Sequence, residues 1–236
     1  MGLYMRALRI LILAAALIAG AVSLAWAAED ELVKKIQSTY EGLKSFDSKF
    51  KQNLKNTSTG DGEERTGVLY FKKPKLIRWE TTAPTKELLV VGAKDVWDYF
   101  EEDKIAYKYT VESILNSKTM LKFISGQARL DEDFTVTRAK TDPTAKDKGT
   151  VKLDLLPKEP EPQLVQAAVW VDPNTGLLQR ILLQDFYGNQ NELRFEDLKL
   201  NPTLADALFT FIPPKGAEIF DNTKEQPGGH PKQPGK

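Results

Sequence analysis

The segment 67–84, GVLYFKKPKLIRWETTAP, restricts the possible fold more than any other part of the sequence. On both sides of Pro74, large apolar side chains recur at every second position: Leu69, Phe71, Ile77 and Trp79. This spacing places all of them on one face of a pleated sheet. Proline lacks the N–H group that a strand ladder needs, so Pro74 belongs in the turn. The segment therefore predicts a β-hairpin with one strongly apolar face.

Related patterns extend along most of the chain. Residues 30–44 have apolar side chains at helical spacing, which predicts an amphipathic helix. Mixed helical spacings between residues 111 and 130 predict two or three short helices, with Gly126 as a stop signal. Period-two alternation predicts strands at residues 46–54, 64–72, 76–81, 87–91, 95–100, 104–109, 134–140, 151–156, 164–171, 177–185 and 191–200. Such regular strand–turn spacing predicts an antiparallel meander within one sizeable β domain.

The N-terminus has the composition of a secretory signal peptide. Arg6 and Arg9 precede an apolar core at residues 10–18, and small residues lead to the sequence A-W-A at 25–27. We therefore expect a signal peptide at residues 1–27 that is cleaved after its last alanine. An uncleaved membrane anchor is the alternative, because the uninterrupted apolar run continues past the expected cleavage site to Ala28.

At the other end, residues 221–236 are rich in Pro, Gly and Lys and lack large apolar side chains. Such a segment cannot bury enough surface to offset the entropy of ordering it, so we expect a disordered tail. The folded domain is expected to span residues 28–220.

Composition argues against several classes of function. The chain has no cysteine, which excludes disulfides, thiol chemistry, cysteine metal sites and a lipid-modified N-terminal cysteine. Its 33 basic and 33 acidic residues give no net charge, and the basic residues do not gather in a stripe. We therefore expect no nucleic-acid binding. The one histidine, His230, lies in the expected tail, which argues against a catalytic relay or a zinc site. Acidic clusters at 101–103 and 131–133 are interpreted as solvated turns, because adjacent carboxylates point in different directions. We therefore expect no enzyme, no cofactor and no metal site.

The pattern that remains is apolar and aromatic, and it is concentrated in the first half of the predicted sheet. Its members are Phe46, Phe50, Leu69, Phe71, Ile77, Trp79, Trp97 and Tyr99. Aromatic stripes of this kind are typical of an ordinary core, here beneath the N-terminal helix, but they also suit a binding surface for lipid. The residues alone leave both interpretations open.

The order of several motifs resembles the LolA family, periplasmic carriers that move lipoproteins across the bacterial envelope. An F-x-x-x-F strand contains Phe46 and Phe50, and the G-x-L-x-F strand is followed by the basic-proline turn. A W-x-Y strand follows with Trp97 and Tyr99, then the helical interruption, and last F-T-F-x-P-P-K-G at 209–216. The resemblance covers nearly the whole chain after the predicted signal peptide. No single motif is specific, but the ordered set is.

The resemblance implies a mainly β fold with short helices: an incomplete, half-open antiparallel β-barrel with a lid of α-helices over an apolar cavity that holds acyl chains. The implied cavity wall consists of Phe46, Phe50, Leu54, Leu69, Phe71, Ile77, Trp79, Leu88, Val90, Trp97 and Tyr99. The implied lid residues are Ile36, Tyr40, Leu43, Met120, Phe123 and Ile124.

Where the family commonly has an arginine before the turn proline, this chain has Lys73. By the resemblance this residue is a latch that bonds carbonyl groups of the lid helix. Lysine lacks the planar fork of arginine, so Lys72 and Arg78 are alternatives for this role.

The resemblance also implies a function and partners. We expect a monomeric periplasmic carrier that takes lipidated proteins from an inner-membrane ABC-type release complex and passes them to an outer-membrane acceptor. The alternative is a periplasmic regulatory protein on the same fold that senses lipid or lipoprotein. A sensor normally has an added signalling domain, and the few residues after 220 favour the carrier.

Overall fold

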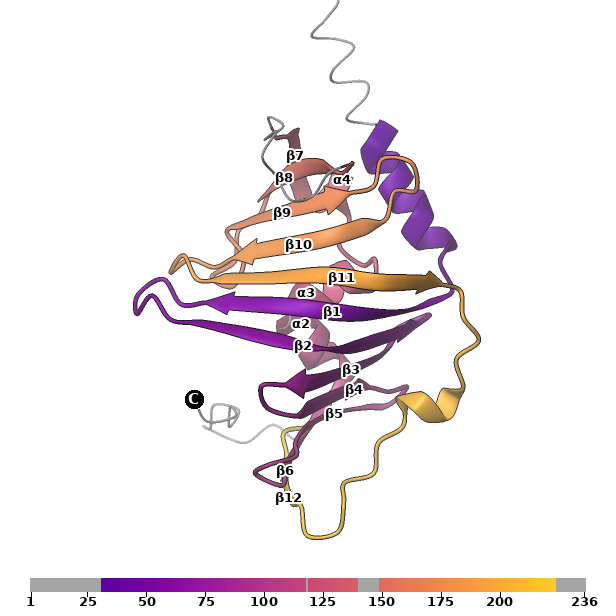
Figure 1. Cartoon of the computed structure of the whole chain (residues 1–236), viewed down its shortest axis with the longest axis vertical. Helices are drawn as coiled ribbons and strands as arrows, with labels where there is room; N and C mark the ends of the chain where they lie inside the picture. Colours follow the sequence, from indigo (N-terminus) through magenta and orange to yellow (C-terminus); the bar gives the residue numbers. More distant parts are fainter. Residues whose placement is uncertain (1–30, 118, 140–148, 224–236) are drawn as a thin grey trace, which may run out of the picture.

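The computed structural model describes residues 31–117, 119–139 and 149–223. Within these residues the chain forms one large sheet of twelve strands with a few short helices (Figure 1). The predicted signal peptide lies outside the described residues, as does the predicted tail from residue 224 onward. No helix among the described residues is both long and apolar enough to cross a membrane.

Two antiparallel meanders make up the sheet. The first consists of β1 (Ser45–Lys55), β2 (Gly62–Lys72), β3 (Leu76–Ala83), β4 (Glu87–Val91), β5 (Asp95–Phe100) and β6 (Ile105–Thr110). The second consists of β7 (Phe134–Arg138), β8 (Val151–Pro157), β9 (Gln166–Val171), β10 (Leu178–Gln184) and β11 (Gln190–Leu200). Pairing of β1 with β11 joins the two meanders.

The order of the strands leaves the sheet unclosed. From one edge to the other the order is β12-β6-β5-β4-β3-β2-β1-β11-β10-β9-β8-β7. The edge strand β12 (Glu218–Asp221) runs parallel to β6 and follows a short 3-10 helix, η1 (Asp206–Phe209). Because β7 and β12 are the two ends of this order, the mainly β, half-open barrel predicted above is confirmed.

The helices cover one face of the sheet, which we call the inner face. The connection from β6 to β7 forms α2 (Val111–Ser117), α3 (Thr119–Ile124) and α4 (Leu130–Asp133), and α2 and α3 lie behind the middle strands in Figure 1. A further helix at residues 31–42 lies at one end of the sheet. The hydrophobic core contains buried residues of the helices and strand residues at alternate positions, those whose side chains point to the inner face. It therefore fills the space between the sheet and the helices.

The strand register places the predicted apolar stripe on the inner face. In the β2–β3 hairpin, Leu69 pairs with Trp79 and Phe71 with Ile77. All four are buried, and Phe46 and Phe50 of β1 belong to the same core. The alternation in the sequence therefore predicted the face of these three strands correctly.

The prediction was wrong for four residues of the next two strands. Leu88 and Val90 pair with Glu80 and Arg78, on the outer face, whereas Leu89 and Val91 face inward opposite Trp79 and Ile77. Trp97 and Tyr99 pair with Val90 and Leu88, so they also lie outside. β4 is apolar at four successive positions, and alternation cannot assign faces in such a strand.

The segment after β11 covers this outer face. Its Phe211 ring lies against Trp97 and Tyr99, with centroid separations of 6.0 and 5.4 Å. Farther along, Phe220 of β12 stacks on Tyr107 at 5.3 Å, and the N–H of Asn222 donates to the Lys108 carbonyl. The predicted domain boundary at residue 220 therefore falls inside a strand, and residues 221–223 belong to the fold.

Candidate functional site

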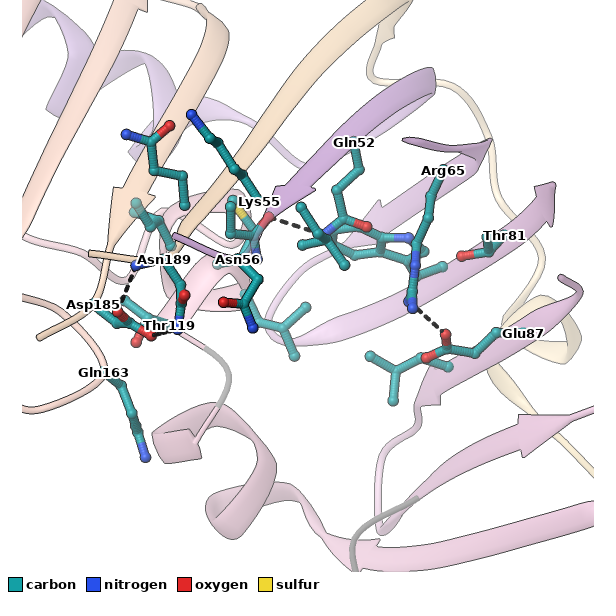
Figure 2. A pocket seen from close by; sticks show the side chains of 18 residues that line it. Gln52, Lys55, Asn56, Arg65, Thr81, Glu87, Thr119, Gln163, Asp185 and Asn189 are labelled. Atoms are coloured by element: carbon teal, nitrogen blue, oxygen red, sulfur yellow. Dashed lines mark hydrogen bonds and ion pairs between the residues drawn. The ribbon is translucent and has the colours of Figure 1, made fainter. Parts of the chain in front are cut away.

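A cavity of about 560 Å³ opens between the inner face and α3. It lies at the end of the sheet where the β1–β2 and β10–β11 turns meet, opposite the helix at residues 31–42 (Figures 1 and 2). The two turns are joined by hydrogen bonds from the Thr57 N–H to the Asn189 side chain and from the Thr57 hydroxyl to the Gly188 carbonyl. The volume falls in the range of small-molecule pockets, roughly 300–1,000 Å³.

Part of the cavity wall is apolar. The strand residues are Leu54, Trp79, Leu89 and Leu183, and α3 contributes Met120 and Leu121. Alternation along β3 turns Trp79 inward, and the Phe50 ring meets it edge to face with centroids 5.1 Å apart. This arrangement is a sheltered hydrocarbon surface with one flexible methionine, a side chain that adapts to ligands of varied shape.

The rest of the wall is polar, and two of its charged residues, Arg65 and Glu87, form an ion pair. Arg65 donates to Glu87 at 2.9 Å and to Glu63 at 2.8 Å, with about a quarter of its side chain exposed (Figure 2). Burial lowers the pKa of Arg65, but the bond to Glu63 and the charge of Glu87 outweigh it and raise the pKa above its ordinary value. Buried Gln52 donates to the Asn191 side-chain oxygen at 2.9 Å. The cavity thus offers hydrogen-bonding groups beside an apolar surface.

Among the described residues, the other end of the inner face is tightly packed. Tyr40 of the helix at residues 31–42 accepts a hydrogen bond from the Leu178 N–H, and burial raises the pKa of its hydroxyl strongly. A side chain at Gly126 would come within 2.9 Å of the Tyr40 Cβ, which shows how closely α3 and this helix approach. Crevices between these parts have volumes of about 10 Å³ each, room for a single water.

The predicted site residues therefore fall into three groups. Leu54, Trp79 and Met120 line the cavity. The predicted residues that are buried in the core beside it are Phe46, Phe50, Leu69, Phe71, Ile77, Ile36, Leu43, Phe123 and Ile124. Tyr40 packs against that core. The third group is the four outer-face residues corrected above.

Sequence reasoning missed several residues that line the cavity. They are Gln52, Arg65, Thr81, Glu87, Leu89 and Leu183, among others. The sequence pattern could have identified two of them. Arg65 is four residues from Leu69 in β2 and Glu87 is two residues from Leu89 in β4, so each points to the same face of its strand as that leucine. A charged residue at an inward position of an otherwise apolar strand face indicates a solvent-accessible part of that face.

Lys73 connects the turn of the β2–β3 hairpin to the N-terminal helix. Its ammonium group donates to the Glu41 carbonyl and its N–H to the Lys44 carbonyl. The alternatives named above have other partners: Lys72 bonds the Leu204 carbonyl and Arg78 the Leu208 carbonyl, both in the segment after β11.

Comparison with known proteins indicates the family of the chain. The family model for outer membrane lipoprotein carrier protein LolA matches residues 41–212. An outer-membrane lipoprotein carrier protein of Pseudomonas putida strain W619 is 27% identical over 220 residues, 92% of this chain and 99% of the relative. A protein of the same name from Nitrosomonas europaea is 24% identical over 188 residues, covering 80% of this chain and 88% of the relative.

Among solved structures, an uncharacterized conserved protein of Thermus thermophilus is similar in fold. Its TM-score is 0.53 at 12% identity, with 82% of this chain and 98% of that chain covered. The fold, the cavity and a family model that spans most of the described residues lead to one assignment. The chain belongs to the LolA family.

Proposed function

We propose that this protein is a periplasmic carrier that binds the acyl chains of lipoproteins released from the inner membrane and delivers them to an outer-membrane acceptor. The observation that carries the proposal is the cavity at the open end of the inner face, with hydrocarbon from Leu54, Trp79 and Met120 beside hydrogen-bonding groups. Relatives named as outer-membrane lipoprotein carrier proteins support lipoproteins as the cargo. Residues 1–27 act as the cleaved signal for export to the periplasm.

The energetics of the cargo require such a shelter. Burying one methylene group is worth ~0.8 kcal/mol, so two or three long chains in water cost tens of kcal/mol. The present cavity is large enough for part of that cargo, and the adjoining core is filled by the protein's own side chains. Further chains therefore enter by displacing α3 and the helix at residues 31–42 from the sheet.

This displacement makes the affinity moderate. The free energy of burying acyl chains is opposed by the packing lost between the helices and the inner face. Lys73 adds to that opposition, because its bond to Glu41 holds the end of the helix to the hairpin, as a latch would. A carrier needs this balance, since an acceptor with higher affinity can then take the cargo without a chemical energy source.

The polar wall serves the other part of the cargo. A lipidated N-terminus has ester and amide groups next to its acyl chains, and these need hydrogen-bond partners once they leave water. The Gln52 and Asn191 amides and the Arg65 guanidinium lie at the cavity, beside its apolar part. We propose that they hold the linkage between the lipid and the polypeptide.

Binding of a synthetic triacylated lipopeptide tests the site. Leu54→Glu introduces a carboxylate into the apolar wall, and we expect the affinity to fall roughly tenfold or more because the charge must be desolvated or the chain excluded. Leu156→Glu is the matched control, since Leu156 is 58% exposed on the outer face of β8. Equal affinities for the two variants would contradict a site at this cavity.

A cellular experiment separates the carrier from a sensor. Depletion of a carrier strands many lipoproteins in the inner membrane, which fractionation and immunoblotting detect. Depletion of a sensor leaves their distribution unchanged and alters only a signalling output. The second outcome would overturn the carrier role while leaving lipid binding intact.

A further inference from the structure

Two aromatic side chains project from the turn between β10 and β11. Phe186 is 73% exposed and Tyr187 is 72% exposed, and their rings meet edge to face with centroids 5.7 Å apart. Phenylalanine is usually buried, so an exposed aromatic pair on a solvated turn is a surface that invites a partner.

The backbone holds this pair outward. The Asp185 carboxylate accepts hydrogen bonds from the N–H groups of Tyr187 and Asn189, each at 2.9 Å, and from the Asn189 amide. The Phe186 N–H donates to the Pro162 carbonyl at 2.9 Å. Three of these bonds restrain backbone N–H groups of the turn, so the Cα atoms that carry the two rings are held in place at the end of the sheet.

The pair also borders the cavity. Asp185 and Asn189, which flank it in the sequence, both line the cavity wall (Figure 2). The β1–β2 turn next to it is bonded to the same loop through Thr57. Residues of both turns therefore belong to the wall of the cavity.

We propose that Phe186 and Tyr187 insert into the surface of a lipid bilayer and hold the cavity opening against it; this inference rests on the proposed function, since the cargo's acyl chains lie in a membrane before and after transport. Two aromatic side chains bury about 300–500 Å² together, at 150–250 Å² each. A stable protein partner or a second copy needs about 800 Å² on each side. An area this small suits weak, reversible anchoring.

The chemistry of the pair fits that occupant. Phenylalanine has a ring that enters the acyl region, and tyrosine adds a hydroxyl that stays with the headgroups, as aromatic residues do at membrane boundaries. Docking in this orientation holds the cavity opening at the membrane surface, close to where the cargo is released and accepted. The turn is therefore a positioning element for uptake and release.

Vesicle co-sedimentation tests the proposal. The full chain is mixed with vesicles of phosphatidylethanolamine and phosphatidylglycerol, and partitioning is compared for the wild type, the double variant Phe186→Ser/Tyr187→Ser, and Ile212→Ser. Ile212 is the matched control, because it is 82% exposed and lies in the segment after η1. We expect the double variant to partition roughly ten- to a hundredfold more weakly and the control to match the wild type.

Several outcomes would overturn the inference. One is that the wild type fails to partition into vesicles, and another is that the double variant partitions as strongly as the wild type. A third outcome is that the wild type and the control form concentration-dependent dimers and the double variant does not, which would indicate a second copy as the occupant. Circular dichroism confirms that the variants fold. A Phe186→Trp variant gives an independent readout, since brominated lipids should quench its added fluorescence and an unquenched signal contradicts insertion. Retained lipopeptide affinity in the double variant separates failure of docking from failure of the proposed function.

Discussion

Among the glycines of the described residues, Gly67 of β2 would make the closest contact if it gained a methyl group. A Cβ at this residue would lie 1.8 Å from the Glu80 carbonyl oxygen and 2.8 Å from the Phe50 ring. The backbone oxygen belongs to β3 and cannot swing aside as a flexible side chain would. The absence of a side chain therefore allows β3 and the Phe50 ring to close over the strand.

The magnitude for Gly67→Ala follows from these distances. The β3 backbone would have to move by about 1 Å, which weakens roughly two ladder hydrogen bonds at about 1 kcal/mol each. Displacement of Phe50 also disturbs its contact with Trp79 at the cavity wall. We expect a loss of about 3 kcal/mol in the free energy of unfolding, the upper part of the usual range for overpacking. For a domain of this size the melting temperature should fall by roughly 6–12 °C.

Urea denaturation followed by circular dichroism, together with thermal melting, measures this loss. Gly62→Ala in the same strand is the control, because a Cβ there would lie 3.6 Å from the Leu54 carbonyl oxygen, an ordinary contact. We expect its stability to change by less than about 0.5 kcal/mol. Equal stabilities of the two variants would refute the reasoning about close approach at Gly67.

Three further predictions concern the latch, a buried tyrosine and the outer face. Lys73→Met removes the bond to the helix carbonyl; we expect less than about 1 kcal/mol of destabilisation but faster hydrogen exchange in the last turn of that helix and faster lipopeptide uptake. Burial, aided by the charge of Asp98, raises the pKa of Tyr109 from 10.0 to about 12. The protonated tyrosine therefore stabilises the fold below pH 10, and wild-type stability in urea titrations should fall between pH 10 and 12 more than that of Tyr109→Phe. Phe211→Ala should cost about 3 kcal/mol in urea unfolding and leave lipopeptide affinity unchanged, because its ring packs on the outer face.

The fold was predictable where the sequence has a single periodicity. Between residues 77 and 80, β3 alternates between buried apolar residues and partly exposed charged ones, so the faces of Ile77 and Trp79 followed from spacing alone. The bounds of β4 and β5 also matched, since turn residues flank both strands. Their faces did not follow, because β4 is apolar on both sides and its outer side is covered by a segment more than a hundred residues later.

Long-range contacts decide the parts that could not be predicted. β12 has four residues after a proline-rich stretch, and it forms because Phe220 stacks on Tyr107 of the edge strand β6. The cavity depends on where α3 crosses the sheet, which no local pattern specifies. The sequence therefore indicated an apolar inner face correctly, but it did not reveal that most of this face is filled and that the free volume lies beside Arg65 and Glu87.

The proposed function requires the cavity to shelter the acyl chains of a lipidated protein. Native mass spectrometry of the full chain purified from the periplasm tests it most directly, with the Leu54→Glu variant measured in parallel. We expect the wild type to carry an added mass that fragments to a lipidated polypeptide, and the variant to carry much less of it. Bare protein alone, under conditions in which another lipid-binding protein keeps its ligand, would contradict the account.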